Sequence, residues 1–138
     1  MESSSDNGDL EATQHAEAAC QHIHGFNRAT LGERNQTPAQ TAEQVAQLAA
    51  AAAALPQAFA QLSMLLDEAL ASQILTMDSL STESDPAMAV GVARLHLDEA
   101  RGHAVDLFKL LDAAHQSTAH IISAGVSHGH DRARWGRR

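Results

Sequence analysis

The most regular pattern in the sequence is formed by apolar residues that recur at alternating intervals of three and four positions. In the first segment these are Val45, Leu48, Ala52, Leu55, Phe59, Leu62, Leu66 and Ala69, followed by Gln73; in the second they are Val90, Ala93, Leu97, Ala100, Ala104, Leu107, Leu111 and Ala114, followed by Thr118 and Ile121. This spacing places all members of a set on one face of an α-helix. The pattern therefore predicts two long amphipathic helices, near residues 38–75 and 86–124, each with an apolar seam.

Capping residues and prolines at the expected helix starts support the same two helices. Thr37-Pro38 and Asp85-Pro86 each place a capping residue before a proline, and Gln40 stands where a capping-box partner would lie. The polar residues 76–85 separate the two segments, so the helices should form an antiparallel hairpin. Pro56 falls inside the first segment, but the spacing keeps its phase, which predicts one continuous helix with a bend near residues 52–56.

A weaker pattern precedes the hairpin. Ala12, Ala16, Ala19, Ile23 and Phe26 recur every three or four residues, which predicts a shorter N-terminal helix near residues 10–31. Residues 1–9 are polar and acidic, and residues 126–138 are rich in His and Arg. Both ends should be disordered.

These elements predict an all-α fold with a single domain over residues 10–125. It would consist of an antiparallel hairpin of two long helices plus a shorter N-terminal helix, arranged as a three-helix bundle or as a dimeric bundle of the four-helix type. Leu107 and Leu111 should then face the region of Ala52 and Leu55 across the hairpin.

The seams leave further large apolar residues uncovered. They are Leu65, Leu70, Ile74, Val92, Leu95, Phe108, Leu110 and Ile122. Two helices of roughly 37 residues are about 55 Å long, which is too long for the N-terminal helix to cover. We therefore expect a non-enzymatic interaction or assembly module whose partner is itself or another helical protein.

The charge distribution suggests an alternative. The formal net charge is −8, yet four of the nine basic residues lie in the last seven positions. This tail contains Arg132, Arg134, Arg137 and Arg138 around Trp135, which could contact nucleic acid or another anion in a small regulatory factor. The acidic body makes nucleic acid an unfavourable partner for the rest of the chain.

Candidate metal ligands and catalytic groups are poorly arranged. Cys20 and His24 stand one helical turn apart, and His96, Glu99 and His103 share a helix face. The imidazoles of His96 and His103 are about 10 Å apart along the helix axis, however, which is too far for one metal ion. No phosphate loop, nucleophile motif or paired Glu-x-x-His set is present. We expect no enzyme activity, no cofactor and no metal, and we interpret Cys20, the single cysteine, as a small buried thiol.

The sequence also gives expectations for location. Its first residues lack the basic and then apolar pattern of a secretory signal. The Ala-rich stretch 45–66 is interrupted by Gln47, Pro56, Gln57 and Gln61, so no membrane span is expected. A cytoplasmic protein follows from these two observations.

Three segments, residues 24–31, 55–62 and 85–90, are similar to those of a group of small uncharacterised actinobacterial all-helical proteins associated with mobile or plasmid-borne gene neighbourhoods. The resemblance covers roughly residues 20–121. It implies an all-α fold and brings no activity, ligand or catalytic residue. The secreted WXG-type hairpin proteins are set aside, because residues 76–85 contain neither Trp nor Gly.

Overall fold

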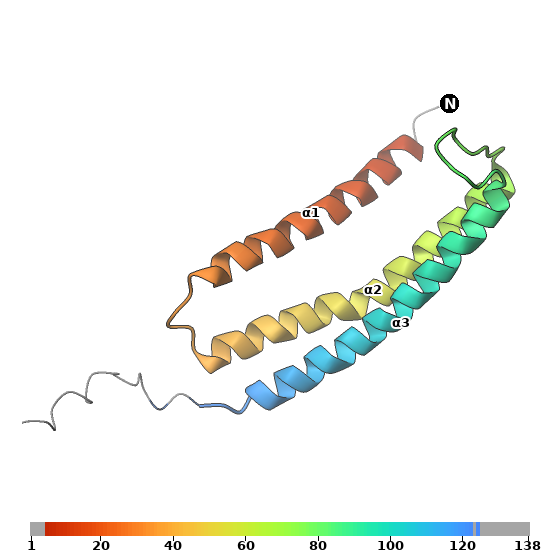
Figure 1. The fold of residues 1–138 in the computed structure, drawn as a ribbon. Helices are drawn as coiled ribbons and strands as arrows, with labels where there is room; N and C mark the ends of the chain where they lie inside the picture. The colour runs from red at the N-terminus through yellow and green to blue at the C-terminus, as the bar shows by residue number, and fades with distance from the viewer. Residues whose placement is uncertain (1–4, 123, 125–138) are drawn as a thin grey trace, which may run out of the picture. The chain divides into compact units, whose positions relative to one another are not determined.

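The computed structural model describes residues 5–122 and residue 124, and this part of the chain contains three α-helices and no strand. They are α1 (Ser5–Leu31), α2 (Pro38–Ser72) and α3 (Pro86–Thr118). The chain divides into two compact units at Gln36 and Thr37, so α1 belongs to one unit and the α2–α3 pair to the other. The predicted all-α class, with a long hairpin and a shorter N-terminal helix, is confirmed (Figure 1).

The second unit is an antiparallel hairpin in which α2 and α3 lie side by side (Figure 1). Two contacts fix which parts of the helices are level. The Nδ1 atom of His115 lies 3.0 Å from the carbonyl oxygen of Ala42, and the Nη1 atom of Arg94 lies 3.2 Å from the Oδ1 atom of Asp67. The start of α2 is therefore level with the end of α3, and the end of α2 with the start of α3.

Both predicted helix starts are confirmed, because each depends on neighbouring residues alone. At α2 the Thr37 hydroxyl accepts a hydrogen bond from the Gln40 backbone N–H at 3.2 Å, and the Thr37 N–H donates to the Gln40 side chain at 2.9 Å. At α3 the Asp85 carboxylate accepts from the Ala87 N–H at 2.9 Å. These bonds satisfy donors that the first helical turn leaves without a partner.

The predicted helix ends were placed too far along the chain. α2 ends at Ser72 rather than residue 75, and α3 ends at Thr118 rather than residue 124. The last hydroxyls of each helix donate to carbonyls one turn back: Ser72 to Glu68 at 2.6 Å, and Thr118 to Ala114 at 2.9 Å. Such bonds compete with continued helix formation, so Ile74, Ile121 and Ile122 lie beyond the helices.

α1 differs from the prediction at its start and in its burial. It begins at Ser5, so residues 5–9 are helical rather than part of a disordered leader; once a helix is nucleated, each further residue adds a hydrogen bond. Cys20 is exposed, which contradicts the buried thiol. Ile23, one turn further along α1, is exposed as well.

α2 runs without a break through Pro56, as predicted. The pair of helices is gently curved along its length (Figure 1). A proline in a helix removes one backbone hydrogen bond, and packing against a second helix compensates for that loss. Here Pro56 is half-buried and lies on the side of α2 that faces α3.

The side of each helix that faces the other, which we call the contact line, differs from the predicted seam. On α2 it consists of Ala42, Val45, Ala49, Ala52, Pro56, Phe59, Ser63, Leu66 and Leu70, and on α3 of Val90, Ala93, Leu97, Ala100, Ala104, Phe108, Leu111, His115 and Thr118, all buried or half-buried. Half of the α2 seam was therefore placed one residue too early, since Leu55 and Leu62 are exposed while Pro56 and Ser63 face α3. On α3 the seam holds as far as Ala104, and then the line shifts from Leu107 to Phe108.

The buried residues explain this shift. Every buried apolar residue in the described chain is an alanine except Val90. Small side chains on the contact line let the helix axes approach each other closely, and Leu48, Leu55 and Leu62 then lie beside the line rather than on it. Leu111 is level with the first turns of α2, since it precedes His115 by one turn; it does not face Ala52 and Leu55 as expected.

Candidate interaction surface

One side of α2 carries a continuous row of uncharged apolar residues next to the contact line. Each member directly precedes a contact-line residue, so the row lies about 100° round the helix from α3. The members are Leu48, Ala51, Leu55, Ala58, Leu62, Leu65 and Ala69, and we call this row the leucine stripe. Its intervals again alternate between three and four, which is the spacing of a surface that packs against another helix.

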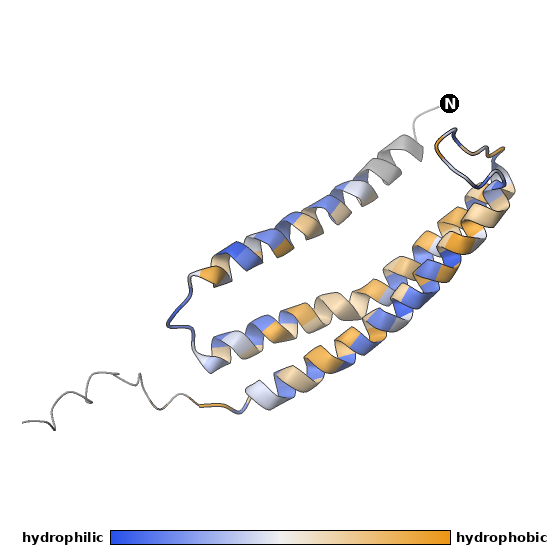
Figure 2. Ribbon diagram, in the orientation of Figure 1, coloured by the Kyte–Doolittle hydropathy of each residue, from blue (hydrophilic) through white to orange (hydrophobic). Residues whose placement is uncertain are grey.

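The leucine stripe is exposed in its middle. Leu55, Leu62 and Leu65 are 38%, 48% and 57% exposed, while Leu48 and Ala69 at the two ends are half-buried. A stripe of this kind is costly to leave in water, because apolar surface gains roughly 25 cal/mol per Å² when it is buried. In Figure 2, α2 is coloured mostly orange and pale, whereas the coloured part of α1 alternates between blue and orange.

The ion pair shows which side of the hairpin the stripe occupies. Asp67 and Arg94 directly follow the contact-line residues Leu66 and Ala93, and they meet at 3.2 Å on one side of the hairpin. Because the helices are antiparallel, residues that follow the contact line on either helix share that side, and residues that precede it share the opposite side. The hairpin therefore has a charged face around this ion pair and an apolar face with the leucine stripe.

α3 contributes its own residues to the apolar face. Leu107 and Leu110 lie near its end, both exposed, and Val92 lies near its start. Between them, preceding Leu97, Ala100 and Ala104, come the three polar residues His96, Glu99 and His103. Along α3 this face is therefore apolar near the start of the helix, polar in the middle and apolar near the end.

The residues predicted to form an interaction surface are only partly on this face. Leu65, Val92 and Leu110 are on it. Leu70 and Phe108 are half-buried on the contact line, so they already pack against the other helix. Leu95 is exposed on the side of α3 away from α2.

The two remaining isoleucines, Ile74 and Ile122, lie outside the helices and are almost fully exposed. Sequence reasoning missed Leu48, Leu55 and Leu62, because it assigned them to the contact with α3. A second heptad register, one residue earlier than the contact line, was the signal that could have identified them.

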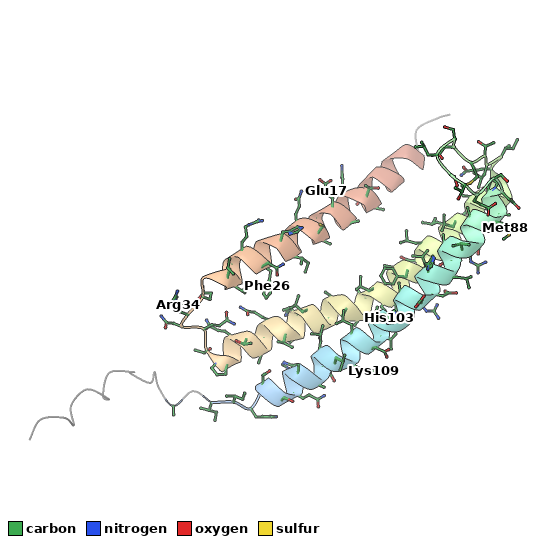
Figure 3. All side chains as sticks on the ribbon, in the orientation of Figure 1. Glu17, Phe26, Arg34, Met88, His103 and Lys109 are labelled. Atoms are coloured by element: carbon green, nitrogen blue, oxygen red, sulfur yellow. The ribbon has the colours of Figure 1, made fainter. Side chains whose placement is uncertain are left out.

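The described residues do not gather into a metal centre. In residues 5–122 and 124, no three or more His, Cys, Asp or Glu side chains are close enough to hold a metal ion. The nearest imidazole and carboxylate of the candidate trio are His103 and Glu99, 3.7 Å apart and both largely exposed. Figure 3 shows His103 and Lys109 among the side chains that project from α3.

A shallow hollow near His103 is lined by residues of α3 alone, from Asp98 to Asp106. A single helix supplies no opposing wall, and this hollow therefore resembles an ordinary helix surface more than a binding pocket. The basic tail residues Arg132, Arg134, Trp135, Arg137 and Arg138 lie outside the described residues.

α2 is long and apolar enough to cross a membrane by length and composition, which differs from the expectation drawn from its interruptions. Helices that pack against other proteins in water can meet the same criterion. Only 17% of its most apolar window is buried, so packing within the hairpin leaves most of this apolar surface uncovered.

Compared with known proteins, the chain matches no family model, no curated protein and no solved structure. The geometry of the hairpin therefore carries the functional argument.

Proposed function

We propose that this chain is a non-enzymatic helical interaction module, whose hairpin binds a helix of another copy or of another helical protein through the leucine stripe. The observation that carries the proposal is the stripe itself, seven consecutive heptad positions occupied only by Leu and Ala and exposed in the middle. Leucines at helical spacing bind a partner helix by side-chain packing.

The proposal is supported by the contrast between the two faces of the hairpin. The face around Asp67 and Arg94 carries charged side chains, which are well solvated. The leucine stripe carries none, so a partner helix can cover it without burying an unpaired charge.

Two matched substitutions test the proposal. Leu62→Glu places a charge on the leucine stripe, and Leu95→Glu places the same charge on an exposed leucine of α3 that faces away from α2. Each variant and the original chain are compared by light scattering and by co-purification from the cells that express them, with circular dichroism to verify folding. We expect Leu62→Glu to lose a complex that the original chain and Leu95→Glu both retain.

The proposal fails if all three proteins are monomers and co-purify with the same proteins, or with none. The alternative drawn from the sequence, contact with nucleic acid through the Arg-rich tail, depends on residues that lie outside the described part of the chain.

A further inference from the structure

We infer that the occupant of the leucine stripe is a second copy of this chain, packed antiparallel so that the twofold axis passes beside Ala58. This inference rests on the proposed function and names its partner. It comes from the order of large and small residues along the stripe.

The outer positions of the stripe are complementary in size to the reversed stripe, and its inner positions pair like with like. When two copies of α2 run antiparallel with Ala58 beside Ala58, Leu48 of one copy meets Ala69 of the second, Ala51 meets Leu65, and Leu55 meets Leu62. A large residue thus meets a small one at the outer levels, two alanines meet at the centre, and two leucines flank the centre. Alternation of large and small side chains across facing helices fills space without voids.

The central alanines allow the two helices to come close. Interaxial distances of packed helices are about 8–10 Å, and the side chains at the crossing point set the value. Ala58 is exposed and has no charged residue beside it on the stripe. A twofold axis there makes the interface isologous, so that one patch serves both copies.

α3 has a matching symmetry on the same face of the hairpin. On this face α3 carries, in order, Val92, His96, Glu99, His103 and Leu107. If a second copy of α3 runs in the opposite direction with Glu99 level with Glu99, Val92 lies level with Leu107, and His96 with His103. Apolar residues then lie level with apolar residues of the second copy, and His96 with His103, whereas the two Glu99 carboxylates lie level with each other, a like-charge juxtaposition that works against this pairing. The middle of α3 is level with the middle of α2, because the contacts of Ala42 with His115 and of Asp67 with Arg94 lie towards the two ends of the hairpin.

A second copy fits this surface better than a lipid bilayer does. A helix that spans a membrane is apolar around its whole circumference. α2 carries Gln47, Gln57 and Gln61 outside the stripe, and the ion-paired Asp67 on the charged face. The apolar surface is therefore about as wide as one partner helix.

Cysteine cross-linking tests the inference in the full-length chain, with the exposed Cys20 replaced by Ser. Ala58→Cys should form a disulfide-linked dimer under mild oxidation, because a disulfide needs Cα atoms about 4–7 Å apart. Ala53→Cys is the matched control, an exposed alanine of the same helix on the other side of the contact line. It should cross-link at least roughly tenfold more slowly, since its thiols would lie on the outside of the dimer.

Ala51→Cys tests the orientation. The antiparallel arrangement separates the two Ala51 positions by about 21 Å along the axis, so this variant should remain uncross-linked, whereas a parallel dimer would cross-link it as well as Ala58→Cys. All three positions are exposed alanines, and circular dichroism verifies that the variants fold. Light scattering of the original chain at micromolar concentration should give twice the mass of one chain.

Equal cross-linking of Ala58→Cys and either control overturns the inference. So does a monomeric mass with no cross-link at Ala58, whether the stripe is then covered by α1, by another protein or by lipid. In the last case the chain would sediment with phospholipid vesicles. If the chain is monomeric but Leu62→Glu loses a co-purifying protein, the second copy is excluded while the proposed function stands.

Discussion

Ser63 is the one buried residue of the contact line with a polar side chain. It is 8% exposed, and its hydroxyl has no hydrogen-bond partner among the described residues. A buried hydroxyl without a partner costs free energy, because it gives up its bonds to water and receives none in return. Its neighbours along the contact line, Phe59 and Leu66, are apolar.

Replacement of Ser63 should therefore stabilise the protein. We expect Ser63→Ala to raise the free energy of unfolding by about 1–2 kcal/mol, measured by urea denaturation. The control is Ser117→Ala, because the Ser117 hydroxyl is exposed and donates to the Ala113 carbonyl at 2.9 Å. Both changes raise helix propensity alike, so a gain at Ser63 that does not exceed the gain at Ser117 would contradict the prediction.

At the scale of the helix, the features that depend on neighbouring residues could be predicted from the sequence. The starts of α2 and α3 depend on Thr37, Gln40 and Asp85, whose bonds reach only two or three residues along the chain. The helix type and the hairpin follow from periodicity in the same way. These parts of the fold were predictable from the residues alone.

The rotation of α2 about its axis was not predictable in this way. Spacings of three and four fit two lines equally well, one through Leu55 and Leu62 and one through Pro56 and Ser63, and both lines share Ala52 and Phe59. Assigning the leucines to the interior follows hydrophobicity, whereas the structure places small residues, alanines and Ser63, at the most buried positions of α2. The difference lies in the close approach of two backbones, which is a property of the helix pair and not of either helix. The candidate surface was misplaced for the same reason.

Two adjacent alanines of α2 test this rotation. Ala52 is 3% exposed on the contact line, and Ala53 is exposed. Ala52→Leu should lower the free energy of unfolding by about 1–3 kcal/mol, because the extra atoms separate the helices. Ala53→Leu makes the same chemical change at the next position and should stay within about 0.5 kcal/mol.

Chemical denaturation of both leucine variants at one protein concentration provides the comparison. Equal effects at the two positions, or a larger loss at Ala53, would mean that the contact line has been assigned to the wrong side of α2.

At the scale of the whole molecule, burial is shallow. No large side chain in the described part of the chain is fully buried, and the buried apolar residues are four alanines and Val90. The heat capacity of unfolding reports newly exposed apolar surface, and folded proteins average about 12–15 cal/mol/K per residue. We expect the monomer at high dilution to fall below this range, and the associated form at high concentration to lie closer to it.

Differential scanning calorimetry over a hundredfold or wider range of protein concentration measures this quantity and the melting temperature together. The melting temperature should rise with concentration, as it does whenever a partner binds only the folded state. A heat capacity and a melting temperature that do not change across this range would contradict the prediction.

The alanine-filled interior also has a consequence for the amount of protein that a cell can keep. A hairpin with so few buried methyl groups has little folding free energy of its own, and proteases degrade chains that open. Copies made in excess of their partners would be cleared, whereas paired copies would persist. The weak interior would make survival depend on association, and the affinity between partners would then set a threshold of abundance, below which the protein is short-lived and above which it accumulates.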